Sequence, residues 1–387
     1  MASEITAPDH HHGLVALMGS LRRGLDDPHC PEPVLEALPP AEVAAARSVV
    51  LLIIDGLGSG FLREHGGALN GHLRTELSSV FPSSTAPAIS SFMTGVAPGR
   101  HGVTGWFTWL RELGLVATVL PWCSRLGGQS LAALGADPAW ALGACSVFDR
   151  LPVTGHYVIG RELVHSAYSG AAAGQARRHG YHDLNDCLER VWRLARARGG
   201  RRFIYAYWPR LDSLSHRHGC ASEPVVAHWQ MVAAALERLI EALRGSDTLL
   251  LITADHGFVD CDPAGVLQLG EHPELAETLA LPLCGEPRAA FCYVRPERVR
   301  AFEHYVTTRL EHGCLLRRSA DLLADGWFGP PPHHPRLAAR IGDYVLLARD
   351  RHVLIDRLPG ESPWSLIGVH GGVSAAEMRV PLLVAQG

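Results

Sequence analysis

The sequence predicts an α/β protein with a mostly parallel central sheet and an inserted cap region. Three observations support this fold class. Apolar runs of strand length alternate with amphipathic helical segments, two of the runs end in a carboxylate near glycine, and this rhythm breaks off between residues 259 and 365. The 387 residues are enough for one large domain that carries an insertion.

The core elements follow one another along the chain. Residues 48–54 (SVVLLII) form the first expected strand and residues 75–80 the second, before a turn into a helix at FPSSTAPAISSFMTG. DLNDCLERVWRLARARGG has apolar residues at helical spacing and then a Gly-Gly stop. RFIYAYW is a strand, residues 223–244 are an amphipathic helix, TLLLIT is another strand, and EMRVPLLVAQ returns to the core.

The chain divides into three expected parts. We expect residues 1–44 to be an N-terminal helical lead-in, and residues 45–258 and 366–387 to form the α/β core. Residues 259–365 contain the Pro-rich stretch GPPPHHPR and the short strand-like pieces AAFCYV, DYVLLA and HVLI. We expect this last part to be an insertion or cap packed on the core.

Composition and charge narrow the possible partners and location. The net charge of −4 leaves no general basic surface, so we expect no polymeric nucleic acid partner. No stretch approaches ~18 consecutive apolar residues and the start lacks the pattern of a signal peptide, so no membrane partner is expected. The nine scattered cysteines, without a CxxC pair, favour reduced thiols in the cytoplasm. The oligomeric state is left open.

Metal-ligating side chains gather after the predicted strands. Ligands of open parallel sheets bind beyond the carboxyl ends of the strands. Asp55 follows the first strand, and Asp255 and His256 follow TLLLIT. After RFIYAYW, Asp212 and His216 are four residues apart, so both can face one point on a helix.

Two further residues complete the candidate site. His370 lies between glycines in GVHGG, which suits a close approach of backbone to a site. The three carboxylates and three histidines together suit two adjacent divalent ions, with Zn²⁺ favoured and Mn²⁺ or iron as alternatives. Thr85 precedes an expected helix, where a hydroxyl is either a cap or a nucleophile; Ser83 or Ser84 is an equally suitable cap.

The motifs IIDGLG, FPSSTAP…TGVAPGRHG, LDSLSHRHG, TADHGF and GVHGG, in this order, resemble the alkaline phosphatase superfamily, in its nucleotide pyrophosphatase/phosphodiesterase branch. The resemblance covers roughly residues 48–258 and 366–384. It implies a three-layer αβα sandwich and hydrolysis of a small-molecule phosphate ester through a covalent phosphothreonine at Thr85. It also implies two ions, one held by Asp55, Thr85, Asp255 and His256 and the other by Asp212, His216 and His370.

The expected substrate contacts depart from the pattern of that branch. Ala86 stands where an aromatic residue usually follows the nucleophile, and Trp106 stands where an asparagine usually contacts the phosphate. Tyr207 occupies the place of a stacking tyrosine. The resemblance therefore implies a phosphodiesterase or nucleotide pyrophosphatase-like enzyme with Tyr207 and Trp106 as substrate contacts, without implying nucleotide specificity.

Three alternatives stay open. Phosphonoacetate hydrolase shares the threonine nucleophile and the ligand order, but C–P hydrolysis would need basic residues for the substrate carboxylate. Arg125, Arg161 and Arg288 are available, although their spacing does not single them out. A phosphomonoesterase would keep the same mechanism. A non-hydrolytic metal-binding module is consistent with the altered substrate contacts, but the intact set of seven site residues argues against it.

Overall fold

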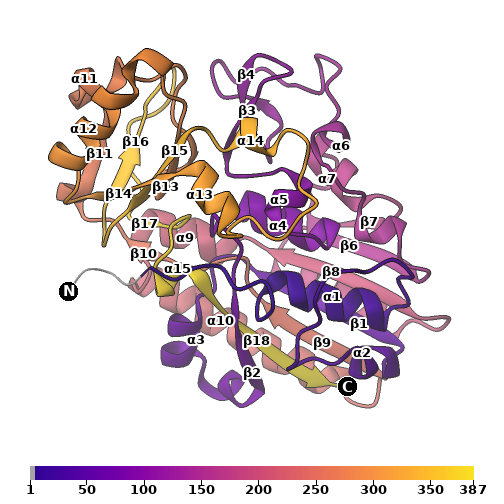
Figure 1. Ribbon diagram of the computed structural model, residues 1–387. Coiled ribbons are helices and arrows are strands. Elements are labelled where there is room, and N and C mark those ends of the chain that lie inside the picture. Colours follow the sequence, from indigo (N-terminus) through magenta and orange to yellow (C-terminus); the bar gives the residue numbers. More distant parts are fainter. Residues whose placement is uncertain (1–4) are drawn as a thin grey trace.

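The computed structural model describes residues 5–387, which form two seven-stranded sheets joined by helices (Figure 1). The larger sheet is the centre of the main core. Its strands lie in the order β2 (Leu73–Ser78), β18 (Arg379–Gln386), β9 (Thr248–Thr253), β1 (Ser48–Ile54), β8 (Arg202–Trp208), β6 (Thr154–Gly160) and β7 (Arg177–Tyr181).

The large sheet is parallel except at β18, which runs antiparallel to both of its neighbours. Ser48 of β1 pairs with Arg202 of β8 on one side and with Thr248 of β9 on the other. The three central strands therefore start at one level, and their carboxyl ends meet at one edge. That edge is where the predicted site residues follow the strands.

Helices flank the large sheet, and every residue of β1 is buried, as expected of a strand covered on both faces. α8 packs on β1 and β8. The ring of Phe92 in α4 lies 6.4 Å from that of Tyr205 in β8. The predicted α/β class with a mostly parallel sheet is confirmed. The flanking helices are α1 (Leu14–Gly24), α3 (Ser59–His65), α4 (Thr85–Thr94), α5 (Pro98–His101), α7 (Ala167–Ala173), α8 (Leu184–Arg196), α9 (Arg210–His218) and α10 (Glu223–Leu243).

The second sheet is antiparallel throughout. Its order is β14 (Cys314–Arg318), β15 (Tyr344–Ala348), β13 (Ala289–Cys292), β12 (Cys284–Glu286), β3 (Phe107–Leu110), β4 (Leu115–Thr118) and β5 (Cys123–Ser124). The sequence predicted residues 107–124 to lie in the core segment, yet they extend the sheet of the cap segment through the pair Gly285–Phe107. Strands that are this far apart in the sequence leave no local pattern from which their pairing could be predicted. The boundaries of the cap stay a prediction.

Two short sheets complete the strand pairing among residues 5–387. In one, β10 (Val259–Asp260) pairs with β17 (Gly368–Val369), which sets His370 beside the large sheet. In the other, β11 (Val266–Gln268) pairs with β16 (Val353–Ile355). The remaining helices are α2 (Pro40–Ala45), α6 (Pro138–Ala141), α11 (Pro273–Ala276), α12 (Val299–Arg309), α13 (Ser319–Ala324), α14 (Leu337–Arg340) and α15 (Ala375–Met378).

The predicted N-terminal lead-in packs into the main core. Leu14, Leu17 and Leu21 of α1 are buried in the same apolar cluster as the central strands. Residues 1–4 of this segment lie outside the described residues. In the part of the chain that is described, no helix is long and apolar enough to span a bilayer. The nine cysteines, all described, form no disulfide.

Candidate metal and catalytic site

The predicted site residues come together at the carboxyl edge of the large sheet. Most of these residues lie in the segments that come directly after the neighbouring strands β1, β8 and β9, and this explains why they are close together. Asp55 follows β1, Asp212 and His216 lie on α9 after β8, Asp255 and His256 follow β9, Thr85 is the first residue of α4, and His370 follows β17. The six aspartates and histidines form two compact triads.

The first triad consists of Asp55, Asp255 and His256, all buried. Nε2 of His256 lies 3.4 Å from Oδ1 of Asp55 and 3.5 Å from Oδ2 of Asp255. Oγ1 of Thr85 lies 3.1 Å from the same nitrogen. One imidazole nitrogen therefore faces two carboxylates and a hydroxyl at once.

The second triad consists of Asp212, His216 and His370 and is more open to solvent. Oδ1 of Asp212 lies 3.3 Å from Nε2 of His216 and 3.7 Å from Nε2 of His370. The ring of His370 stacks on that of His256, with centroids 3.7 Å apart and planes 19° apart. This stacking places the two triads side by side.

The donor atoms of both triads fit divalent cations. Oδ1 of Asp55, Oδ2 of Asp255 and Oδ1 of Asp212 are buried and make no hydrogen bond to the described residues. Buried carboxylate oxygens without a partner are costly. Ligands about 2.0–2.1 Å from a tetrahedral zinc ion lie about 3.3–3.4 Å from one another, close to the separations seen in both triads. The residues therefore fit such an ion in each triad.

Backbone carbonyl groups hold two of the histidines in the orientation that a metal ligand needs. Nδ1 of His216 lies 2.8 Å from the carbonyl oxygen of Gly368, and Nδ1 of His256 lies 3.1 Å from that of Gly257. A carbonyl oxygen can only accept, so Nδ1 carries the proton in each ring. Nε2, which faces the carboxylates, is then left with its lone pair.

Burial and neighbouring charges shift the pKa values of two side chains at the site when only the protein's own charges are considered. Burial, followed by the charges of Asp212 and Asp255, raises the pKa of Asp55 well above its ordinary value. Burial, followed by the charges of His256 and His216, lowers the pKa of His370 well below its ordinary value. A cation beside these side chains would favour both the ionised aspartate and the neutral histidine, which are the forms that bind metal.

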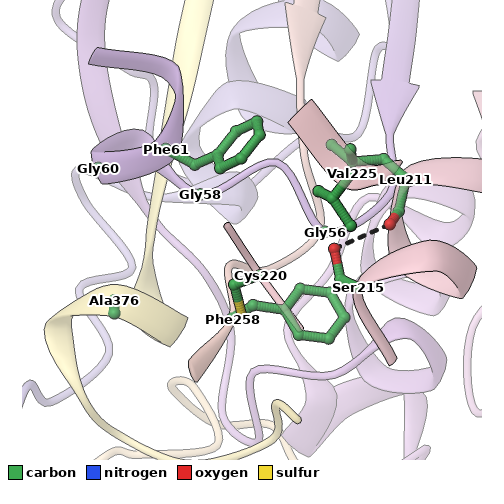
Figure 2. Close-up of a pocket in the computed structure, with 10 residues that line it drawn as sticks. All are labelled: Gly56, Gly58, Gly60, Phe61, Leu211, Ser215, Cys220, Val225, Phe258 and Ala376. Carbon is green, nitrogen blue, oxygen red and sulfur yellow. Dashed lines mark hydrogen bonds between the residues drawn. The ribbon is translucent and has the colours of Figure 1, made fainter. Parts of the chain in front are cut away.

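Glycines allow the two carboxylate-bearing turns to pack closely. Gly56, directly after Asp55, has a φ of 77°, and a Cβ there would lie 2.4 Å from the Phe258 ring. A Cβ on Gly257 would lie 2.0 Å from the carbonyl oxygen of Ala376. Phe258 and Gly56 also line a small cavity of about 70 Å³ behind the site, together with Ser215 (Figure 2). Phe258 thus packs behind the ligand rings and contacts that of His216 edge-on, with centroids 5.0 Å apart.

Tyr207 contacts the first triad. Its buried hydroxyl donates a hydrogen bond to Oδ2 of Asp55. This bond occupies one carboxylate oxygen and turns the other, Oδ1, toward His256. Tyr207 is not among the described residues that line the large cavity at the site. Its expected contact with substrate stays a prediction, whereas its contact with a candidate metal ligand is a feature that the sequence did not reveal.

A cavity of about 400 Å³ opens in front of the triads and holds the expected substrate contact Trp106. Its wall also contains Glu286, at the end of β12, which sequence reasoning missed. Burial raises the pKa of Glu286 to about 7. No sequence signal marked this residue, because the turn GEP carries no motif. The lining residues are Ser84, Thr85, Trp106, Phe107, Asp212, His216, Glu286, Pro287, Trp364, Leu366, Val369 and His370.

The three arginines considered for a substrate carboxylate lie outside this cavity. Arg288 is buried and forms an ion pair with Glu377 through two hydrogen bonds. Arg125 pairs with Glu361 and lines a neighbouring cavity. Arg161 contacts the ring of His182 at an exposed position. Among the described residues that line the site cavity, none is lysine or arginine.

Comparison with known proteins relates this arrangement to one family. The sequence model of the family described as type I phosphodiesterase/nucleotide pyrophosphatase matches residues 49–357. No curated protein matches the chain. The solved structure of murine ectonucleotide pyrophosphatase/phosphodiesterase 5 superposes with a TM-score of 0.65 at 16% identity, covering 87% of each chain.

Two further solved structures share the fold. An inactive threonine-to-alanine variant of the same murine protein, in complex with AMP, has the same TM-score of 0.65, 16% identity and 87% coverage of each chain. Phosphonoacetate hydrolase from Sinorhizobium meliloti, in complex with phosphonoformate, has a TM-score of 0.62 at 17% identity, covering 88% of this chain and 90% of that one. At these identities the likeness is one of fold.

Proposed function

The chain belongs to the type I phosphodiesterase/nucleotide pyrophosphatase family, and on this premise we propose that it is a phosphodiesterase with Thr85 as nucleophile. The family is one of phosphodiesterases and nucleotide pyrophosphatases in the alkaline phosphatase superfamily, and the similar structures are those of a member of this kind and of phosphonoacetate hydrolase. The observation that carries the proposal is the position of Thr85 on the cavity wall, with Oγ1 3.1 Å from Nε2 of His256. The inactive threonine-to-alanine variant of the murine protein supports a threonine in this role.

We propose that the site holds two divalent cations. Zn²⁺ is the expected ion, with Mn²⁺ or iron as alternatives, because the ligands are nitrogen and oxygen atoms only. When bound, such ions lower the pKa of a coordinated hydroxyl and neutralise anionic oxygens. One ion would be held by Asp55, Thr85, Asp255 and His256, and the other by Asp212, His216 and His370.

The reaction then proceeds on Thr85. Oγ1 gives up its proton to solvent and attacks phosphorus in line, the bond to the leaving oxygen breaks, and that oxygen takes up a proton from solvent. Water next cleaves the bond between phosphorus and Oγ1 and restores the hydroxyl. The backbone N–H groups of Thr85 and Ala86 lie in the first turn of α4, where the helix dipole favours a non-bridging phosphate oxygen.

A substrate screen on zinc-reconstituted enzyme tests this function. It compares p-nitrophenyl phosphate, bis(p-nitrophenyl) phosphate, p-nitrophenyl thymidine monophosphate and phosphonoacetate. We expect the diesters to be turned over fastest, with no large gain from the thymidine group. A preference for the monoester would make the protein a phosphomonoesterase. A preference for phosphonoacetate would contradict the expectation drawn from a cavity lined, among described residues, without lysine or arginine.

Replacing Tyr207 by phenylalanine should weaken metal binding by about 10- to 100-fold, because Asp55 loses the hydroxyl that orients it. The apo variant and the wild type are titrated with Zn²⁺ in a chelator buffer, and bound zinc is measured directly. A buried tyrosine elsewhere, Tyr157 replaced by phenylalanine, is the control. Unchanged zinc affinity with a raised KM would instead make Tyr207 a substrate contact.

We also propose that the protein works in a reducing compartment such as the cytoplasm. The nine unpaired cysteines support this location. Labelling of unreduced protein with a thiol reagent after denaturation should modify all nine, and protected cysteines would argue for disulfide formation in the cell.

A further inference from the structure

The buried serine Ser83 forms a hydrogen bond that joins two turns of the candidate site. Its side chain is 0% exposed, and Oγ donates to the backbone carbonyl oxygen of Gly372 at 2.7 Å. Ser83 lies two residues before Thr85, and Gly372 lies two residues after His370. One hydrogen bond therefore connects the turn that presents the proposed nucleophile with the turn that presents a ligand of the second triad.

The hydroxyl of Ser83 is available for this bond because it does not cap α4. The sequence makes Ser83 and Ser84 equally suitable caps, but Ser84 occupies the N-cap position and its side chain makes no capping hydrogen bond. A serine hydroxyl has one proton to donate. In Ser83 that proton goes to the turn of His370 instead of to the helix.

The two triads are connected to Thr85 in different ways. Oγ1 of Thr85 lies 3.1 Å from Nε2 of His256, a member of the first triad. Among the hydrogen bonds of residues 5–387, none joins Thr85 to a side chain of the second triad. The position of the second triad relative to the nucleophile therefore depends on less direct contacts. These are the stacking of His370 on His256 and the bond from Ser83.

His370 lacks the support that holds the other two histidines. Nδ1 of His216 and Nδ1 of His256 each lie against a backbone carbonyl group, whereas the buried Nδ1 of His370 makes no hydrogen bond to a described residue. Burial and the rings of His256 and His216 lower the pKa of His370, while the backbone of Ser83 raises it, so this backbone lies near the ring. Two glycines follow His370, and glycine leaves the backbone unusually free. Hydrogen bonds to this turn therefore decide where His370 lies.

Gly372 is held from two sides. Its N–H donates to Oε1 of Glu377 at 2.8 Å, and its carbonyl oxygen accepts from Ser83. The bond to Glu377 attaches the turn to a segment five residues away in the sequence, whereas the bond from Ser83 attaches it to a segment 289 residues away. Without the hydroxyl of Ser83, the turn of His370 would keep its local attachment but lose its hydrogen bond to the turn of the nucleophile.

We propose that Ser83 is a positioning residue, whose hydroxyl fixes the turn of His370 against the turn of Thr85 and so holds the second triad in place for a cation. The inference rests on the proposed two-cation phosphodiesterase site and adds to it a residue that binds neither cation. Replacing residues that orient metal ligands changes metal affinity by about 10- to 100-fold. Because Ser83 acts through the backbone near one ligand, we expect the lower end of that range and an effect on one ion only.

Zinc binding to Ser83→Ala tests the inference. Apo wild type and apo variant, both checked for a native circular dichroism spectrum, are titrated with Zn²⁺ in a chelator buffer, and bound zinc is measured directly. His370→Ala identifies the ion of the second triad, because it removes one ligand of that ion. We expect Ser83→Ala to lower the affinity for the same ion about tenfold and to leave the affinity for the other ion unchanged.

Two further variants separate positioning from a general loss of stability. Ser48, at the start of β1, is also 0% exposed and donates to a backbone carbonyl oxygen, that of Ala195, at 2.7 Å. Ser48→Ala removes an equivalent bond at the other end of β1 from Asp55 and should keep both zinc affinities. Ser83→Cys fills nearly the same space with a weak donor, and it should lower the same affinity even if the alanine variant does not fold.

A double variant tests whether Ser83 acts through His370. In the His370→Ala background, the zinc affinity that remains reports on the first triad. Adding Ser83→Ala to this background should change that affinity by less than about twofold, as expected when the second change acts only through the residue already removed. A larger loss would mean that Ser83 acts on the first triad and would overturn the inference.

The outcomes distinguish this inference from the proposed function. Equal zinc affinities of the wild type and the Ser83 variants would overturn the inference, and so would an equal loss for both ions. If the wild type hydrolyses bis(p-nitrophenyl) phosphate in parallel, the phosphodiesterase function stands in either case. A wild type that binds two zinc ions without turning over any diester would overturn that function, and the binding data alone would then decide the role of Ser83. A wild type that binds fewer than two zinc ions would overturn the two-cation site and the inference with it.

Discussion

Replacing Thr85 by alanine should lower kcat on bis(p-nitrophenyl) phosphate by roughly 10³-fold or more, as loss of a catalytic nucleophile does in other hydrolases. That loss corresponds to at least about 4 kcal/mol of barrier. The physical reason is that Thr85 carries the hydroxyl that faces the first triad. Thr85 is the first residue of α4, and its hydroxyl faces Nε2 of His256. The measurement is steady-state kinetics on the zinc-loaded variant.

Two controls distinguish a nucleophilic role of Thr85 from a structural one. Thr85→Ser keeps a hydroxyl on the same backbone and should retain measurable turnover, while thermal unfolding of the alanine variant should stay close to that of the wild type. Acid-quenched wild type should carry a phosphoryl adduct on the peptide that contains Thr85. Unchanged turnover of the alanine variant would refute the assignment and turn attention to Ser84, which also lines the cavity.

Replacing Arg288 by methionine should lower the free energy of unfolding by about 3–5 kcal/mol, the cost of breaking a buried ion pair from one side. Nε and Nη2 of Arg288 donate to the two carboxylate oxygens of Glu377 at 2.9 and 2.8 Å, and both side chains are buried. Nη1 also donates to the carbonyl oxygens of Asp350 and His352. Urea unfolding followed by circular dichroism measures the effect.

The pair also links the expected cap segment to the candidate metal site. Glu377 accepts a hydrogen bond of 2.8 Å from the N–H of Gly372, two residues after His370. Burial alone would raise the pKa of Glu377, but the charge of Arg288 lowers it below its ordinary value. The stabilisation is therefore present at neutral pH and is lost only as the pH falls through that lowered pKa.

A double substitution checks the pairwise origin of this effect. Arg288→Met combined with Glu377→Gln should cost less than the sum of the two single changes, because it leaves no uncompensated charge. A loss below about 1 kcal/mol for Arg288→Met would contradict a stabilising role for the pair. Its burial also explains why Arg288, considered as a carboxylate binder from the sequence, lies away from the cavity.

Local sequence patterns predicted the six candidate ligands, and the family resemblance implied their division into two groups. Asp55 and Asp255 each follow an apolar run, and Asp212 and His216 are one helical turn apart. A parallel sheet brings the ends of such runs to one edge, whatever the details of packing. The strands β1, β8 and β9 follow this rule, since they pair in a register that brings their ends to the same level. The metal-binding and nucleophilic roles of these residues stay predictions that the experiments above test.

The remaining features depend on contacts between distant segments. Glu286 reaches the site because β12 pairs with β3 through Gly285 and Phe107, and Tyr207 meets Asp55 across two neighbouring strands. Neither contact leaves a periodicity or motif in the sequence, since each depends on where an antiparallel partner or a facing side chain arrives after folding.

The sequence by itself determined the fold class, the edge of the sheet at which the site lies, and the residues that form both triads. Only the tertiary structure decided what surrounds them: the cavity wall of Trp106 and Glu286, the hydrogen bond of Tyr207 to Asp55, and the burial of Arg288 against Glu377. The physical reason is one of range. Strand ends and helical spacing are set by neighbours in the chain, whereas the charge and shape of a cavity are set by side chains that only folding brings together.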